Sequence, residues 1–415
     1  MRNTCSTFDR SFSKLVLLAA ILALMSTAPQ RTQAQTETVL HSFSANNDGC
    51  LPWAGLTLDP KNRLFGTTQG CGPGGAGTVY RIQRRTGKEK VLYGFDGLDG
   101  SILEGGVIFD AAGNIYGTSC CGGPNNYGTV YKLSPLPKNK WQETLLYAFK
   151  GGADGYGPGT GKLAMDAEGN LYGAAAGGDL QCDAPYGCGI VFKVAPDGTK
   201  TILHNFSGGL DGQTIYGSVV IDAQGNLYGT TTIGGTFGMG TVFKITPAGS
   251  KTTLYSFVGG SDGAYPQAGL TLDANGNIYG TTSGGGTPNM GTVFEVTQAG
   301  IEKVLYSFSG PDGNYPYAGV TLDKQGNVYG TTYAGGNFGC PVGGVDLGCG
   351  TVFKITTAGV ESVLYSFTSV PDGSHPVAPL VLDKKGAIYG TTYFGGGDEQ
   401  NCGSPGCGTV FKVVP

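Results

Sequence analysis

Aspartate recurs at regular positions along this chain, and the two recurring sets are its main candidates for acid–base or metal chemistry. In the first set each aspartate precedes a glycine, at Asp48, Asp99, Asp154, Asp211, Asp262, Asp312 and Asp372. In the second set each aspartate ends an apolar run, at Asp59, Asp110, Asp166, Asp222, Asp273, Asp323 and Asp383. A ring of carboxylates could bind cations, but aspartate and glycine in this pattern are typical of turns. We therefore expect both sets to serve turns, and we predict no metal site and no cofactor.

The sequence shows few of the residue patterns that enzymes use. It has three histidines, none near cysteines at zinc-binding spacing, and it has no Gly-x-Ser-x-Gly nucleophile motif. Glu104 is the obvious charged residue that breaks the repeating pattern before an apolar run. The enzymatic alternative is a lyase or hydrolase that uses carboxylates, with or without a divalent metal. We favour a non-catalytic protein over this alternative.

Aromatic residues at positions that differ between repeats are the candidates for ligand binding. They are Trp53, Tyr156, Tyr216, Tyr317, Tyr333 and His375. Exposed rings of this kind could stack on sugars or grip a peptide. Packing between repeats is the alternative, because Tyr265-Pro266 and Tyr315-Pro316 occur at equivalent positions.

These residues belong to a repeat whose clearest part is Gly276-Asn277-Ile278-Tyr279-Gly280-Thr281-Thr282. Its seven copies centre on an aromatic residue, at Phe65, Tyr116, Tyr172, Tyr228, Tyr279, Tyr329 and Tyr389. Each repeat of roughly 50 residues holds four runs rich in β-branched and aromatic residues, separated by turn-forming residues. Four antiparallel strands in that length predict one blade of a propeller. The predicted fold is all-β, a seven-bladed β-propeller, in which the glycine of the second strand lets a neighbouring blade approach closely.

The two ends of the repeat region predict how the ring closes. Residues 39–43 match the fourth, outer strand of a blade, whereas residues 408–413 match a third strand. We expect residues 37–43 to pair with residues 408–413, so that the N-terminal strand completes the C-terminal blade. This pairing leaves no open sheet edge.

The first 34 residues predict a secretory signal peptide, followed by one propeller domain over residues 35–415. Arg2, Arg10 and Lys14 precede the apolar residues 15–25, and Ala34 ends the candidate cleavage site. The mature chain would be secreted, periplasmic or at the cell surface, as a monomer without a transmembrane segment. Charged residues make up 13% of the chain and its net charge is −4, which argues against a nucleic-acid partner.

Ten cysteines follow the predicted signal, an even number that favours disulfides in an exported chain. Their positions in the loops favour the pairs Cys50–Cys71, Cys182–Cys188, Cys340–Cys349 and Cys402–Cys407. Cys120 and Cys121 are then left and could form a strained vicinal bond, while a metal site is the alternative to disulfides. All ten fall in loops on one face of the predicted propeller, and we expect that face to bind the ligand because braced loops lose little entropy on binding.

The repeats resemble those of a known family, the GloVer tandem repeat of secreted bacterial proteins. The resemblance rests on Leu254-Tyr255-Ser256-Phe257, Asp262-Gly263, residues 276–282 and Gly291-Thr292-Val293-Phe294, and it extends over residues 36–415. The blades are also similar, more loosely, to the NHL-type repeat. This resemblance implies an exported propeller without an assigned molecular function, and longer members carry a C-terminal sorting segment that this sequence lacks. We therefore expect a binding or scaffold protein that recognises a glycan or a protein at or outside the cell surface.

Overall fold

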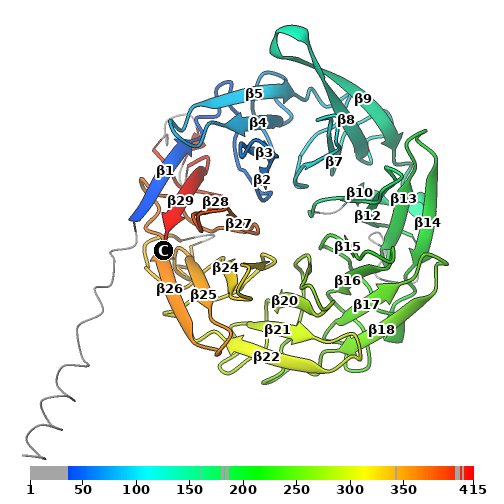
Figure 1. Cartoon of the computed structure of the whole chain (residues 1–415), viewed down its shortest axis with the longest axis vertical. Coiled ribbons are helices and arrows are strands. Elements are labelled where there is room, and N and C mark those ends of the chain that lie inside the picture. Colours follow the sequence, from blue (N-terminus) through cyan, green and yellow to red (C-terminus); the bar gives the residue numbers. More distant parts are fainter. Residues whose placement is uncertain are drawn as a thin grey trace, which may run out of the picture. The chain divides into compact units, whose positions relative to one another are not determined.

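Strands of alternating apolar and small residues form seven antiparallel sheets, arranged around a centre as the blades of a propeller (Figure 1). Six sheets have four strands, and the third has a fifth strand, β10. The computed structural model describes residues 36–158, 160–178, 182, 187–341, 344–397, 402–403 and 406–415. The predicted fold class is confirmed, whereas the predicted signal peptide lies outside the described residues. No helix in the described part of the chain is long and apolar enough to cross a membrane.

Each blade begins with a two-residue inner strand near the centre, followed outward by a second, a third and an outer strand. The inner strands are β2 (Thr57–Leu58), β6 (Ile108–Phe109), β11 (Ala164–Met165), β15 (Val220–Ile221), β19 (Thr271–Leu272), β23 (Thr321–Leu322) and β27 (Val381–Leu382). The second strands are β3 (Leu64–Thr68), β7 (Ile115–Ser119), β12 (Leu171–Ala176), β16 (Leu227–Thr231), β20 (Ile278–Thr282), β24 (Val328–Thr332) and β28 (Ile388–Thr392).

The outer half of each blade is formed by longer hairpins. The third strands are β4 (Thr78–Ile82), β8 (Thr129–Leu136), β13 (Ile190–Val194), β17 (Thr241–Ile245), β21 (Thr292–Val296), β25 (Thr351–Ile355) and β29 (Thr409–Val414). The outer strands are β5 (Glu89–Gly94), β9 (Lys140–Ala148), β14 (Lys200–Asn205), β18 (Lys251–Ser256), β22 (Glu302–Ser307), β26 (Glu361–Ser366) and β1 (Thr36–Ser42). The remaining elements are β10 (Tyr156–Pro158) and the short 3-10 helices η1 (Pro137–Asn139), η2 (Gly152–Asp154) and η3 (Gly209–Asp211).

The glycine of each second strand makes room for an aromatic side chain of the same blade. Gly280 pairs with Phe294, and a Cβ atom on Gly280 would lie 2.6 Å from Phe294 Cζ. Gly117 has the same relation to Tyr131, whose hydroxyl oxygen would lie 2.4 Å from such an atom. The predicted approach of a neighbouring blade to this glycine is therefore wrong. The ring that needs the space comes from the adjacent strand of the same sheet.

One aromatic contact joins each blade to the next. The phenylalanine that follows each outer strand is buried, at Phe43, Phe95, Phe149, Phe206, Phe257, Phe308 and Phe367. It packs on the third-strand aromatic ring of the next blade, as Phe257 does on Phe294 with ring centroids 5.0 Å apart. The seven centroid distances lie between 4.9 and 5.2 Å, a separation at which aromatic rings attract one another.

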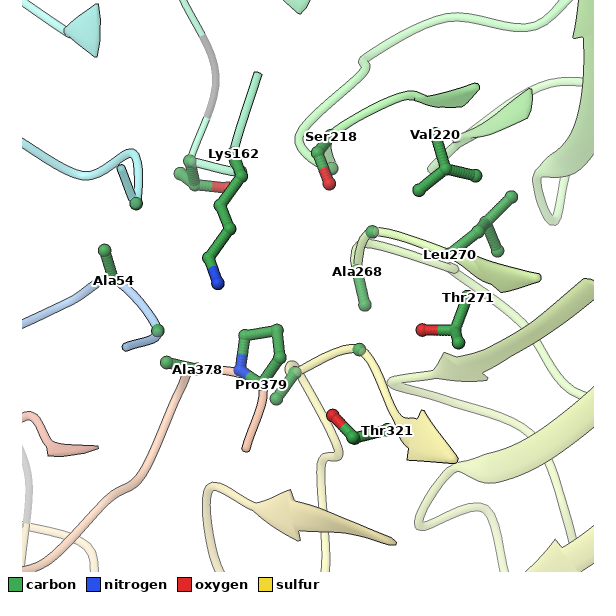
Figure 2. Close-up of a pocket in the computed structure, with 18 of the residues that line it drawn as sticks. Ala54, Lys162, Ser218, Val220, Ala268, Leu270, Thr271, Thr321, Ala378 and Pro379 are labelled. Carbon is green, nitrogen blue, oxygen red and sulfur yellow. The ribbon is translucent and has the colours of Figure 1, made fainter. Parts of the chain in front are cut away.

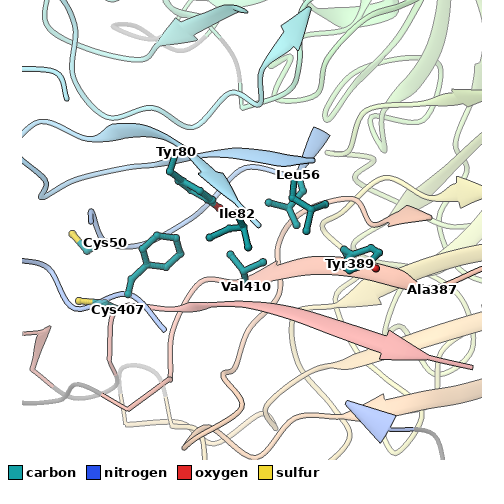
Figure 3. Packing of buried hydrophobic residues seen from close by; sticks show 10 residues of the cluster. Cys50, Leu56, Tyr80, Ile82, Ala387, Tyr389, Cys407 and Val410 are labelled. Atoms are coloured by element: carbon teal, nitrogen blue, oxygen red, sulfur yellow. The ribbon is translucent and has the colours of Figure 1, made fainter. Parts of the chain in front are cut away.

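The same contact recurs where the ring closes. β1 (Thr36–Ser42) pairs antiparallel with β29 (Thr409–Val414), so the predicted closure by the N-terminal strand is confirmed. Phe43 then packs on Tyr80 of the first blade, with ring centroids 5.1 Å apart. Figure 3 shows this buried cluster, in which Tyr80 of the first blade lies near Val410 of the last. Closure of the ring therefore uses the same aromatic packing that joins the six other pairs of neighbouring blades.

Both aspartate sets make the predicted turn contacts. In the second set, Asp273 accepts hydrogen bonds from the backbone nitrogen of Asn277 at 2.8 Å and from its side-chain Nδ2 at 3.0 Å. In the first set, Asp262 accepts from the backbone nitrogen of Val258 at 2.6 Å and from the Tyr255 hydroxyl at 3.0 Å. These bonds satisfy backbone groups at the points where the chain reverses.

Four of the predicted disulfides are formed. They are Cys50–Cys71, Cys182–Cys188, Cys340–Cys349 and Cys402–Cys407, with Cα–Cα distances of 5.4, 5.1, 5.1 and 5.3 Å. Cys120 and Cys121 are both free thiols, and the distance between their Sγ atoms is 3.2 Å. The vicinal bond that the sequence left open is therefore not formed, which agrees with the strain that such a bond imposes.

We predict that Tyr131→Phe stabilises the protein. The Tyr131 side chain is fully buried, and its hydroxyl has no hydrogen-bond partner among the described residues. Removing a buried unpaired hydroxyl should raise the free energy of unfolding by about 1 kcal/mol, measured by urea denaturation. Tyr147→Phe is the matched control and should lower it, because the Tyr147 hydroxyl donates to Asp154 at 2.8 Å. A loss of stability in Tyr131→Phe would show that its hydroxyl has a partner.

Candidate functional site

The seven inner strands surround a central cavity of about 970 Å³, lined by residues from every blade (Figure 2). Small side chains just before the inner strands leave this space open, since alanine occupies one equivalent position in four blades, at Ala54, Ala268, Ala318 and Ala378. A cavity of this size is within the range that holds small-molecule ligands. The side chains that vary around it therefore decide what it can bind.

One ring of lining residues has a different residue type in almost every blade; only tyrosine occurs twice. It lies six residues before the aspartate that ends each inner strand, and we call it the mouth ring: Trp53, Glu104, Thr160, Tyr216, Gln267, Tyr317 and Val377. Three of the predicted ligand residues, Trp53, Tyr216 and Tyr317, belong to this ring, as does Glu104. Half of the Tyr216 surface is exposed.

A second set of side chains supports the mouth ring from the ends of the second strands. We call it the support ring: Gln69, Cys120, Ala176, Thr232, Ser283, Tyr333 and Tyr393. The Tyr393 hydroxyl donates to Gln69 Oε1 at 3.0 Å, and Gln69 Nε2 donates to Glu104 Oε1 at 2.7 Å. Burial raises the pKa of Glu104, although the hydrogen bond from Gln69 opposes this rise. Glu104 is thus a positioned carboxyl that retains a proton more readily than usual.

Aromatic rings connect the two sets over the sixth, seventh and first blades. Tyr317 stacks on Tyr315 with centroids 5.9 Å apart and meets Tyr333 edge-on at 5.3 Å. Trp53 meets Tyr393 edge-on at 4.9 Å. These contacts hold Trp53 and Tyr317 in fixed orientations, so both rings are presented to the cavity with little freedom to lose on binding.

Two predicted ligand residues lie elsewhere. His375 is only 2% exposed and packs between Tyr333 and Phe394, so it supports the aromatic cluster and presents no surface to a ligand. Burial lowers the pKa of His375 to about 4, which leaves the ring neutral near pH 7. Tyr156 lies in β10 and packs on Tyr127, with ring centroids 6.3 Å apart, away from the residues that line the cavity.

Lys162 is a functional candidate that the sequence reasoning missed. It occupies a position that is glycine in four blades, among Gly55, Gly106, Lys162, Ser218, Gly269, Gly319 and Pro379. Figure 2 shows its side chain extending into the cavity. Nζ donates to the main-chain oxygen of Leu56 at 2.7 Å, and burial lowers the pKa of Lys162 to about 8. Aligning the repeats on the aspartate after the inner strand would have found it.

Glu104 and Lys162 are the charged residues among the described residues that line the cavity. They come from the second and third blades, which are neighbours. The described part of the chain holds no cluster of three or more His, Cys, Asp or Glu side chains suited to a metal ion. Cys120 lies in the support ring, where burial, Cys121 and the charge of Glu104 all raise the pKa of its thiol. That thiol stays protonated and is a poor nucleophile.

Part of the chain is similar to a known family of repeats. Residues 24–184 match the family model described as the Gloeobacter/Verrucomicrobia repeat, which confirms the resemblance inferred from the sequence for this part of the chain. No curated protein matches.

Solved structures share the fold at low identity. One is the extracellular domain of a proposed hybrid two component system from B. thetaiotaomicron, with a TM-score of 0.57 and 11% identity. That match covers 91% of this chain and 39% of the other, so this chain spans about two fifths of its length. Another is an oligogalacturonate lyase from Vibrio parahaemolyticus, with a TM-score of 0.53, 12% identity and coverage of 93% and 95%. These likenesses show the propeller fold alone.

Proposed function

We propose that this propeller of the Gloeobacter/Verrucomicrobia repeat is an exported binding protein that holds a glycan at the mouth of its central cavity. The observation that carries the proposal is the mouth ring, which combines fixed aromatic rings with hydrogen-bonding side chains around an open cavity of about 970 Å³. Sugars offer apolar faces to aromatic rings and hydroxyl groups to polar side chains. A site with both kinds of contact is suited to them.

Two polar side chains of the mouth ring, Gln267 and Glu104, come from the fifth and second blades, one on each side of the aromatic cluster. Gln267 donates to Ser283 at 3.3 Å, and Glu104 accepts from Gln69 at 2.7 Å. Each of these groups keeps further hydrogen-bonding capacity for a ligand. A sugar ring in the mouth could therefore stack on Trp53 and bond to amide and carboxyl groups.

Lys162 favours a sugar that carries a carboxylate. Its ammonium has three donors and makes one hydrogen bond within the described part of the chain, to the main-chain oxygen of Leu56. It lies inside the cavity beyond the mouth ring, so an acidic group of a bound sugar could reach it. The four disulfides support export to an oxidising compartment, where extracellular glycans are found.

A lyase acting on an acidic glycan is the second candidate, and the environment of Glu104 favours it. A carboxyl with a raised pKa can act as a general acid, and a lysine in the same cavity can neutralise a sugar carboxylate. Hydrolysis by two carboxylates has less support, because Glu104 is the one carboxylate among the described lining residues.

We predict that Trp53→Ala and Tyr317→Ala each weaken glycan binding about tenfold or more, because truncating a central aromatic anchor removes a large share of the binding energy. A glycan array on the mature chain would identify the ligand, and calorimetry would measure the dissociation constant. Tyr127→Ala is the control, since Tyr127 is 45% exposed but does not line the cavity. Unchanged affinity in both variants, or loss caused instead by substitutions at Asn226 or Asn275, would place the site elsewhere.

We predict that Lys162→Gly weakens binding of acidic sugars roughly tenfold and leaves neutral sugars unaffected, because a charged hydrogen bond is lost. The pKa of Lys162 is about 8, so its positive charge disappears as the pH rises through that value. Affinity of the unmodified protein for an acidic sugar should therefore fall between pH 7 and pH 9, whereas the affinity of Lys162→Gly should not. Ser218→Gly, at the equivalent position in the next blade, should behave like the unmodified protein.

The lyase is tested by incubating the protein with oligouronides and following the absorbance of the unsaturated product. Turnover that is lost in Glu104→Gln, with sugar affinity retained, would establish catalysis and overturn the non-catalytic reading. No turnover together with measurable binding is the outcome that we expect.

A further inference from the structure

Each junction between neighbouring blades brings a partly buried charged residue to the aspartate of an Asp-Gly pair. The residue lies near the start of the outer strand and pairs with the end of the third strand, as Glu302 does with Val296. It is a lysine in two blades, Lys200 and Lys251, and a glutamate in the other five, Glu37, Glu89, Glu143, Glu302 and Glu361. The partner of Lys251 is Asp211, and the partner of Glu302 is Asp262.

In the two lysine junctions the chain supplies its own cation. Lys251 Nζ lies 2.8 Å from the main-chain oxygen of Asp211 and 2.9 Å from its carboxylate, and the lysine side chain is 8% exposed. Lys200 Nζ makes the same two contacts with Asp154, and its side chain is 3% exposed. The Lys251 ammonium also lies over the ring of Phe206, 5.5 Å from its centroid. The fold thus builds a pocket that receives a positive charge.

In the five glutamate junctions the equivalent place holds a second carboxylate in place of the lysine ammonium. The Oε1 atom of each glutamate is buried and has no hydrogen-bond partner within the part of the chain that the structure describes: Glu37, Glu89, Glu143, Glu302 and Glu361. An aspartate faces each of them, at Asp372, Asp48, Asp99, Asp262 and Asp312. A carboxylate with one buried, unpaired oxygen beside a second carboxylate is costly, so a positive charge, either a cation or a proton, is needed to compensate it.

We propose that each of these five junctions binds a hard cation of the calcium type, which takes the place that the lysine ammonium occupies in the other two. The protein ligands at each junction would be the glutamate carboxylate, the aspartate carboxylate and the aspartate main-chain oxygen. Calcium accepts oxygen ligands of these kinds and completes its shell with water. Two carboxylates balance its charge, just as one aspartate balances one lysine. Extracellular calcium suits such weakly binding sites.

The competing account is a proton shared by the two carboxyl groups. The groups that face Glu302 are Asp262 and Tyr255. Burial, the negative charge of Asp262 and a hydrogen bond between the two carboxyl groups raise the pKa of Glu302 to about 7, from an ordinary value of 4.5. Without a cation, stability from this junction should be full below pH 4.5 and should be lost as the pH rises through 7. A bound cation would restore it at higher pH, which separates the two accounts.

The test converts a glutamate junction into a lysine junction, and a lysine junction into a glutamate junction, in the full-length mature protein. Each protein is first treated with a chelator and then studied at pH 8. Calcium alone is the probe, its binding is counted by equilibrium dialysis, and thermal unfolding is followed with and without it. We expect the unmodified protein to bind five calcium ions and to melt several degrees higher when calcium is present. Glu302→Lys should bind one ion fewer and be more stable than the unmodified protein without calcium. Lys251→Glu should bind one ion more.

The proposal is overturned if calcium neither binds nor shifts the melting temperature of the unmodified protein at pH 8. It is equally overturned if Glu302→Lys binds as many ions as the unmodified protein, because binding would then lie elsewhere. Should Lys251→Glu fail to fold, Glu302→Lys and the isosteric Glu302→Gln decide the question alone. Both remove one buried negative charge, and both should lower the number of bound ions by one.

Discussion

The architecture depends on one aromatic contact made seven times: the buried phenylalanine after each outer strand lies against the third-strand ring of the next blade. Isolated four-stranded sheets of this size have two exposed faces and two edges. The contact between Phe257 and Phe294 covers one face of each of two sheets, and its repetition returns to the first blade through Phe43 and Tyr80. Because every junction has nearly the same geometry, the ring closes and a central cavity is left.

This constraint explains why the second-strand glycine is needed. The receiving ring, such as Phe294, folds over Gly280 in its own sheet, and any side chain there would displace it. A displaced ring could no longer receive Phe257. The glycine therefore acts on the junction indirectly, through the position of an aromatic ring. The sequence shows the recurrence of this glycine clearly, but it does not show which ring lies above it.

The strand order, the ring closure and the four disulfides could be predicted because each follows from a local pattern repeated along the chain. The site could be predicted in part. Trp53 and Tyr317, which line the cavity of the candidate site, could be named because they are aromatic residues at variable positions. The burial of His375 could not be foreseen, because variation alone does not reveal burial. Lys162 was missed because it stands out only by replacing the glycine that most blades have at this position. That replacement is visible only when the repeats are aligned residue by residue.

Function in such a ring must come from departures from the repeat, and the departures are unevenly distributed. The aromatic cluster of Tyr317, Tyr333, Tyr393 and Trp53 lies on the sixth, seventh and first blades, and Tyr216 lies on the fourth. Glu104 and Lys162 lie on the second and third blades. One side of the cavity is therefore apolar and rigid, and the adjoining side is charged. A molecule that touched both sides would need an apolar face and an ionised group in a fixed relation. That pairing restricts the ligand more strongly than either side alone, which is how a symmetric scaffold can acquire a selective site.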